Sequence, residues 1–349
     1  MAKHKHTHYD AAEARILRND SIISSVMATE GSRFDSAEEA AVFFARELDY
    51  VKTRSYDAQY PELTALSLFP ISHEADAGAE TVTYYTYDKT GLAKIIDNYS
   101  TDLPRADVTG SPKTAHVRSL GDSYGYSVQE MRASGLAGKS LDVRKGESAR
   151  YQIDAATNRL AWAGDEKSGI LGVLSAGQNI PLYVLKNNEA GDSAAWVDKT
   201  ADEILADING MTAQVSRTTK HVERPDTLCL PADVYMDIAT RRVGETGETV
   251  LSYILSKSPY LKKVVPAPEL DHDSKDTNPY AASSNQGVAF LFKNDENKLS
   301  LEIPMPFMQH RAQVQNLETV IPCEARVAGV IVYYPMSCLI AVGVSKASE

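Results

Sequence analysis

The feature that most limits how this chain can fold is the stretch of residues 71–126, which contains no amphipathic helix. Its strand-like runs are short, at residues 82–87 and 116–120, and segments rich in Asp, Gly and Pro separate them. Connections longer than about 15 residues are uncommon inside a compact domain, and an isolated hairpin is marginally stable in water. We therefore expect this stretch to project as a two-stranded arm that packs on a partner subunit.

The composition is that of a globular chain without a membrane anchor. Its 349 residues predict about two packed bodies. Hydrophobic residues make up 43% and charged residues 24%, which argues against disorder and fibrous repeats. No apolar run reaches the roughly 20 residues that cross a bilayer, and residues 1–10 do not resemble a secretory signal. We therefore expect a cytoplasmic origin, with reduced thiols at Cys229, Cys323 and Cys338.

Charge and aromatic content bear on possible partners. A net charge of -11 opposes tight wrapping of nucleic acid, because such binding depends on Lys and Arg neutralising phosphates. Any nucleic acid near this protein would be enclosed by it without tight binding. The 18 Tyr against 7 Phe suit half-buried strands, and also subunit interfaces, where a polar tip and an apolar face are both useful.

The order of predicted elements defines an α+β chain. Residues 1–33 are polar and predict an extended arm, and Asp35 with Glu38 predicts a capped helix that buries Phe44 and Leu48. A short helix is expected from Ser127 and a long one over residues 140–162, followed by an apolar connector over residues 169–174.

The second half of the chain predicts a mixed body and then strands. Thr200 and Glu203 form a predicted capping box, and Pro231 opens a further helix. Strands are expected at residues 228–230 and 261–265, then a polar loop over residues 271–286. The remaining strands are expected at residues 288–292, 299–303, 326–334 and 339–344. The last two are apolar nearly throughout and should be central strands.

Two short motifs imitate enzyme sites. Residues 133–140 approach a phosphate-binding loop, but no buried parallel strand is predicted before them and Ala133 replaces the first glycine, so a turn between helices is expected. Residues 121–125 match the nucleophile elbow of hydrolases around Ser123, although the alternating strands and helices of that fold are missing upstream. His4, His6 and His8 are expected in a solvated tail. The sequence predicts no catalytic residue, metal site or cofactor.

This order of elements resembles the major capsid proteins of tailed bacteriophages, which have the Hong Kong 97-like fold. The residues that carry the resemblance are the run Tyr126–Met131, the helix of residues 141–162, the segment of residues 164–174, and the tail segment of residues 320–335. The resemblance covers nearly the whole chain and is one of pattern. It implies a structural subunit and not an enzyme.

The resemblance also implies a division of the chain. An N-terminal arm would span residues 1–48 and an extended β loop residues 71–126. A peripheral domain would take residues 49–70, 127–198 and 301–349, with a long spine helix over residues 139–163. An axial domain would take residues 199–300.

The function implied is self-assembly into hexamers and pentamers of an icosahedral virion head that encloses double-stranded DNA without sequence-specific binding. A portal and a decoration protein are the further partners implied, with no membrane. The sequence shows no helical, charged leader, so a separate scaffolding protein is expected. Some relatives cross-link their subunits through lysine side chains, but that chemistry cannot be carried onto any lysine of the loop, so we expect non-covalent assembly. Aromatic and basic side chains of the arm, the loop and the helix are the candidate inter-subunit contacts: Phe44, Leu48, Tyr85, Tyr87, Lys94, Tyr99, Arg105, Arg118, Arg144 and Arg150.

Two alternatives stay open at this point. An encapsulin-like nanocompartment shell protein would share the fold and package enzymes in place of a genome. A soluble serine hydrolase would be built around Ser123.

Overall fold

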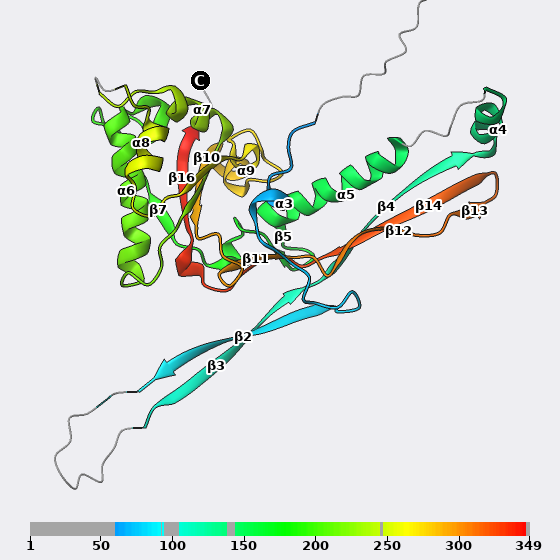
Figure 1. Ribbon diagram of the computed structural model, residues 1–349, viewed down its shortest axis with the longest axis horizontal. Helices are drawn as coiled ribbons and strands as arrows, with labels where there is room; N and C mark the ends of the chain where they lie inside the picture. The colour runs from blue at the N-terminus through cyan, green and yellow to red at the C-terminus, as the bar shows by residue number, and fades with distance from the viewer. Residues whose placement is uncertain (1–59, 92, 94–104, 138–143, 245–246, 347–349) are drawn as a thin grey trace, which may run out of the picture. The chain divides into compact units, whose positions relative to one another are not determined.

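The computed structural model describes residues 60–91, 93, 105–137, 144–244 and 247–346. Residues 61–349 form one compact unit, and the unit of residues 1–60 lies almost wholly outside the described residues. The capped helix expected from Asp35 therefore also lies outside them. The described helices and strands form an α+β arrangement with four sheets (Figure 1).

The sheet with the most deeply buried strands separates two hydrophobic cores. Its order is β7-β16-β10-β8-β9, and its strands span Leu182–Val184, Leu339–Lys346, Gln286–Phe292, Thr227–Leu230 and Lys263–Pro266. Alternate residues of β10 face opposite cores: Phe290 packs in one and Leu291 in the other. Because both faces are covered, β10 and β16 are apolar nearly throughout, and the prediction of a central strand at residues 339–344 is confirmed.

One face of this sheet carries three helices of the second half of the chain. They are α6 (Ala201–Thr218), α7 (Ala232–Thr240) and α8 (Val250–Lys257). The capping box predicted at Thr200 and Glu203 is present, because the Thr200 amide donates to the Glu203 carboxylate at 2.6 Å. The sequence missed α8, and also α9 (Pro279–Ser284), which occupies part of the segment expected as a loop. The range expected for the axial domain also lacks β7 and β16, which this sheet contains.

The other core joins the start of the described chain to its middle. It lies between α3 (Ala65–Leu68), the end of α5 (Arg144–Trp162) and a second sheet of order β1-β11-β15-β6-β5. The strands of that sheet span Ile71–Ser72, Leu299–Glu302, Gly329–Val332, Ile170–Leu171 and Gly164–Asp165. Phe69 lies at its centre, with ring centroids 5.0 Å from Trp162 and 5.7 Å from Phe292.

The long helix packs over a third sheet, which the sequence did not predict. In this sheet β14 (Glu318–Val327) lies between β4 (Arg118–Ser127) and the strands β12 (Met305–Gln309) and β13 (Gln313–Gln315). Ala149 and Ile153 of α5 pack on Cys323 and Ala325 of β14. The start of the helix predicted before Arg144 lies outside the described residues.

The fourth sheet is the hairpin of β2 (Thr81–Thr90) and β3 (Asp107–His116), which extends away from the other sheets (Figure 1). The strand expected over residues 116–120 is divided at the buried Val117, where the chain changes partners: β3 pairs with β2, whereas β4 pairs with β14 over all ten residues. The continuous strand expected over residues 326–334 is likewise divided, at Ala328, between β14 and β15. The predicted short helix from Ser127 is present as α4 (Val128–Ala137).

Candidate assembly surfaces

The β2–β3 hairpin has ten residue pairs in register, from Thr81 with His116 to Thr90 with Asp107. One face of β2 is exposed, and Tyr85 and Tyr87 on it are 60% and 70% exposed. Their rings stack with centroids 6.3 Å apart. A two-stranded sheet with large exposed aromatic side chains gains little from its own packing, so a surface that covers these rings would stabilise it.

The two edges of the hairpin differ. The Val117 amide donates to the Glu80 carbonyl, so these two residues form a hydrogen-bonded pair. Hydrogen-bonded and non-hydrogen-bonded pairs alternate along an antiparallel hairpin, so the main-chain groups of the pair Tyr85 and Pro112 point away from the partner strand. Proline has no N–H, so Pro112 interrupts the outer edge of β3. The outer edge of β2 keeps its N–H groups, and those of Thr83 and Tyr85 have no partner among the described residues.

The root of the hairpin rests on the second sheet. Tyr84 meets Tyr333 edge to face, with ring centroids 5.1 Å apart, and the Tyr333 hydroxyl lies 3.0 Å from the Ser300 hydroxyl. Burial raises the pKa of the Tyr84 phenol, and the neighbouring Tyr333 raises it further. These rings hold β2 against the second sheet.

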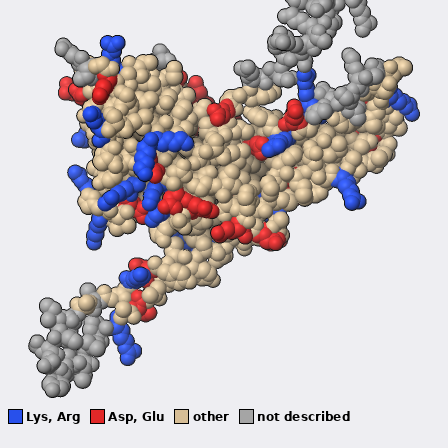
Figure 2. Space-filling view, in the orientation of Figure 1, with Lys and Arg blue, Asp and Glu red and all other residues tan. Residues whose placement is uncertain are grey.

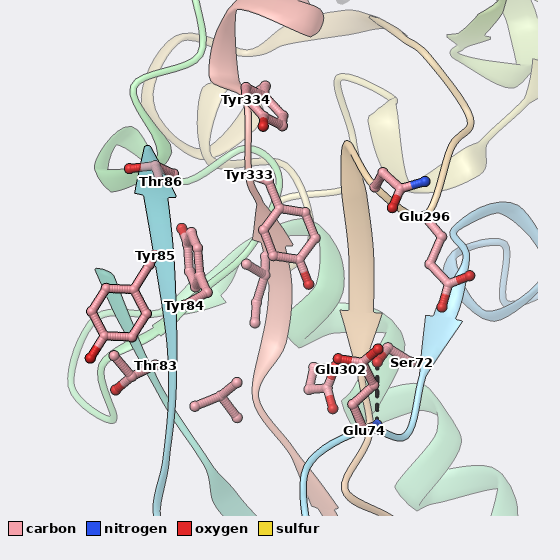
Figure 3. Close-up of a pocket in the computed structure, with 13 residues that line it drawn as sticks. Ser72, Glu74, Thr83, Tyr84, Tyr85, Thr86, Glu296, Glu302, Tyr333 and Tyr334 are labelled. Atoms are coloured by element: carbon pink, nitrogen blue, oxygen red, sulfur yellow. Dashed lines mark hydrogen bonds between the residues drawn. The ribbon is translucent and has the colours of Figure 1, made fainter. Parts of the chain in front are cut away.

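A groove of about 490 Å³ lies beside this contact. Figure 3 shows Tyr84 pointing toward Tyr333, with Glu74, Glu296 and Glu302 farther along the same hollow. Burial raises the pKa of the Tyr333 phenol, and the Glu302, Glu74 and Glu296 carboxylates raise it further, against a hydrogen bond from Ser300 that lowers it. Acidic side chains are also visible beside the hairpin root in the space-filling view (Figure 2). The groove is therefore electronegative.

The edge of β4 is covered by charged side chains of its own chain. The Ser123 amide donates to the Asp122 carboxylate at 2.7 Å, and the Gly125 carbonyl accepts from Lys145 Nζ at 2.9 Å. Lys145 also pairs with Glu130 at 3.2 Å. A hydrogen bond from the main chain of Ser127 lowers the pKa of the Glu130 carboxyl, and Lys145 lowers it further. These contacts occupy main-chain groups that could otherwise pair with another strand.

Further apolar side chains are exposed away from the hairpin. Val314 lies on β13, Leu317 in the turn before β14 and Leu136 on α4, and on the body that contains α6 to α8 they include Val184, Val222 and Met236. Exposed apolar side chains of this kind are typical of subunit interfaces when they form contiguous patches.

The predicted contact residues are scattered over these surfaces. Tyr85 and Tyr87 lie on the hairpin, and the exposed Arg105 precedes β3. Arg118 Nε donates to the Ser168 carbonyl at 2.9 Å, and Arg150 pairs with Asp154 at 3.7 Å within α5. Arg144 is the exposed first residue of α5, whereas Phe44, Leu48, Lys94 and Tyr99 lie outside the described residues.

The geometry does not support the two enzyme-like motifs. Ser123 lies in the middle of β4, opposite Pro322, and not on a turn between a strand and a helix. The described part of residues 133–140 is helical. No group of His, Cys, Asp and Glu among the described residues could hold a metal ion, and none of the described helices is long and apolar enough for a bilayer. Cys229, Cys323 and Cys338 are free and buried, as predicted.

Comparison with known proteins identifies the family. The sequence profile described as "Major capsid protein" matches residues 91–344, which is more than half of the chain. This chain belongs to the major capsid protein family. No curated protein matches the chain. The match confirms the predicted family and does not favour the encapsulin-like alternative.

Solved structures show the fold of this major capsid protein. A chain from the capsid of Myoviridae phage XM1 superposes with a TM-score of 0.71 at 17% identity, covering 86% of this chain and 99% of that one. The capsid of the native GTA particle gives 0.60 at 11% identity, with 90% and 100% covered. Mycobacterium phage Ogopogo gives 0.56 at 14% identity, with 84% and 96% covered. The predicted Hong Kong 97-like α+β fold is thus confirmed.

The family is one of structural proteins that form the shell of the virion, so the chain is a shell subunit that associates with copies of itself. The sequence missed the groove and the covered edge of β4. Glu74 lies more than 200 residues before Glu296 and Glu302 in the sequence, and the three share no motif.

Proposed function

We propose that this major capsid protein closes into hexamers and pentamers of an icosahedral phage head that encloses double-stranded DNA, and that the β2–β3 hairpin is its main assembly arm. The observation that carries the proposal is the hairpin itself. It has ten residue pairs, two exposed tyrosine rings and a small root on the body. Stability missing within one chain would come from a neighbouring copy.

The axial body of residues 199–300, completed by β7 and β16, would meet its copies around the rings. The peripheral parts, with α5 as the spine helix, would lie farther out. The exposed predicted contacts Tyr85, Tyr87 and Arg105 would lie over the neighbour, together with Lys94 and Tyr99 of the same loop. Many contacts per subunit would add to a stable shell although each is weak.

The net charge of -11 supports an inner shell surface that encloses DNA without binding it tightly. Assembly would take place in the host cytoplasm with a separate scaffolding protein and a portal, and a decoration protein could bind the finished surface. In this proposal the subunit is not an enzyme, and the subunits associate without covalent cross-links.

Deletion of residues 83–114, joined by a short glycine linker, tests the role of the hairpin. The Glu80–Val117 contact stays in this variant. The expected result is a soluble folded subunit that forms no shells in negative-stain micrographs. Emission from Trp162 and Trp196, one in each core, checks the fold. Intact shells from the deleted chain would contradict the proposal.

A matched variant shows how much the two tyrosine rings, as distinct from the rest of the hairpin, contribute to shell formation. Tyr85→Thr with Tyr87→Thr keeps both strands, because threonine suits strand positions, and removes the stacked rings. The subunit concentration at which shells first form should rise several-fold. An unchanged concentration would mean that the rings stay in solvent in the shell.

A further inference from the structure

The groove beside the hairpin root follows the open edge of a strand. Five consecutive β2 residues, from Val82 to Thr86, line it, and they point to both faces of the hairpin. No residue of β3 lines it. The groove therefore lies on the side of β2 that faces away from β3, where the main chains of Thr83 and Tyr85 have no partner among the described residues.

The length of the groove fits an added strand. Five residues of β2 extend over about 16 Å at roughly 3.3 Å per residue, so a segment of about five residues could pair along this edge. The cavity volume of about 490 Å³ is within the range of sites that enclose a ligand. Strand addition at an open edge gains main-chain hydrogen bonds, and side-chain pockets then select the sequence.

The opposite wall selects for positive charge. Glu302 is only 2% exposed, and one of its carboxylate oxygens accepts from the Ala75 amide at 3.1 Å. Glu74 and Glu296 are exposed at the rim. No Lys or Arg is among the described residues that line the groove. Lys298 stacks on the ring of Tyr334, which lines the groove, but it pairs with the buried Glu223 at 2.6 Å. A basic strand would bring the charge that this wall lacks.

The structure and sequence together point to an occupant: we propose that residues 2–9 of a second copy bind in this groove as a strand added to β2. Their sequence is Ala-Lys-His-Lys-His-Thr-His-Tyr, which contains no acidic residue. In an extended strand Lys3, Lys5 and Thr7 share one face and His4, His6 and His8 the other. The lysine face meets the wall formed by the glutamates.

The chain is long enough for this contact. About 50 residues separate the segment from the described part of the chain, and such a length can span up to roughly 170 Å when extended. The contact would tie each subunit to the next through its N-terminal residues. The inference rests on the proposed assembly, and it specifies that residues 2–9 of one subunit fill the groove beside β2 of another.

Cysteine pairing tests both the segment and its origin. One chain would carry Lys5→Cys and another Thr83→Cys, and the two would be mixed before assembly and then oxidised. A disulfide-linked dimer is expected, whereas either variant alone should give none. The three native cysteines are buried and should not compete. A link that forms only within a chain carrying both changes, or no link at all in intact particles, would overturn the proposal.

A charge exchange tests the recognition. Glu74→Lys with Glu296→Lys changes two exposed side chains, and the exposed Glu189→Lys is the matched control. In assembled particles the two-site variant should lose hydrogen-exchange protection of residues 2–9 and 81–87 together, and Lys3→Glu with Lys5→Glu should restore it. Protection that persists in the two-site variant would contradict the proposal. Absence of particles from the unchanged chain would instead refute the proposed assembly.

Discussion

The buried carboxylate of Glu269 joins three distant segments of the chain. It accepts hydrogen bonds from the Thr64 amide at 3.0 Å, the Thr64 hydroxyl at 2.7 Å and Asn158 Nδ2 at 2.7 Å. Asn158 in turn accepts from the Ala65 amide at 2.9 Å. The network therefore fixes α3, where the described chain begins, to α5 and to the segment around Glu269.

We expect Glu269→Ala to lower the free energy of unfolding of the unassembled subunit by about 3 kcal/mol. The Thr64 hydroxyl can turn toward another acceptor, but the Thr64 amide and Asn158 Nδ2 would stay buried without a partner. Each unsatisfied donor costs about 1–3 kcal/mol, which gives roughly 2–6 kcal/mol for the two donors. Removal of a carboxylate that is only 6% exposed relieves part of this cost, so the lower half of that range is expected.

Urea unfolding followed by Trp162 emission measures this loss, because Trp162 is fully buried against Phe69 next to α3. Thr64→Val is the matched control: it removes the hydroxyl donor alone and should cost about 1 kcal/mol. A loss below about 1 kcal/mol for Glu269→Ala, or a loss no larger than that of Thr64→Val, would refute the reasoning.

Three further perturbations test other parts of the chain. Asp207→Ala leaves the Lys199 ammonium buried without its partner at 2.5 Å and should cost about 3–5 kcal/mol in urea unfolding; a change within 1 kcal/mol would show that water reaches the pair. Burial raises the pKa of Cys338 to about 12, so its thiol should react with a disulfide reagent at pH 8 only after unfolding, and fast labelling of native protein would contradict this. The main-chain hydrogen bond from Ser127 lowers the folded-state pKa of Glu130, so its contribution is present above the unfolded-state pKa and lost as the pH falls through the folded-state pKa. The protection factors of the α4 amides, which are corrected for the intrinsic exchange rate, should therefore fall below about pH 4 and stay constant between pH 5 and 8.

The elements that the sequence predicted well are those whose local signal agrees with their surroundings. The helix after Thr200 has both a capping box and one apolar face, and it packs on a sheet. The strands β8, β10 and β16 are apolar nearly throughout because they are buried on both faces. In these elements, capping, periodicity and burial lead to the same structure.

The third sheet was missed because its strands lack such a signal. β4 has Ser or Gly at every second position, and β14 contains Pro322, which normally argues against a central strand. The His310 amide donates to the Pro322 carbonyl, so the missing N–H of Pro322 also faces β12 and β13, where the pairing changes from one strand to the other. The pairing with β4 is therefore intact. A pairing between residues about 200 apart has no local pattern that could reveal it.

The candidate contact residues lie in different surroundings in the structure. The lack of a helix over residues 71–126 predicted a two-stranded arm, and the candidate contacts Tyr85 and Tyr87 lie exposed on the hairpin found there. By contrast, Arg118 and Arg150 contact groups of their own chain. Side-chain type alone does not distinguish a residue that awaits a partner subunit from one that is satisfied within its own chain.

The strand edges of this chain are protected unequally, and the difference bears on how a shell subunit avoids random aggregation. Long open edges pair with other chains without selectivity. On β4, Asp122 and Lys145 occupy outward main-chain groups, and on β3 the outer edge lacks an N–H at Pro112. On β2 the open stretch at Thr83 and Tyr85 lies inside an acidic groove, where an incoming strand must be basic to replace the water around the carboxylates. The edge of β4 is blocked because its main-chain groups are already hydrogen-bonded, and the edge of β3 is blocked because Pro112 has no N–H to donate. The edge of β2 stays open, but its acidic surroundings favour a basic strand, so the pairing that remains possible is selective.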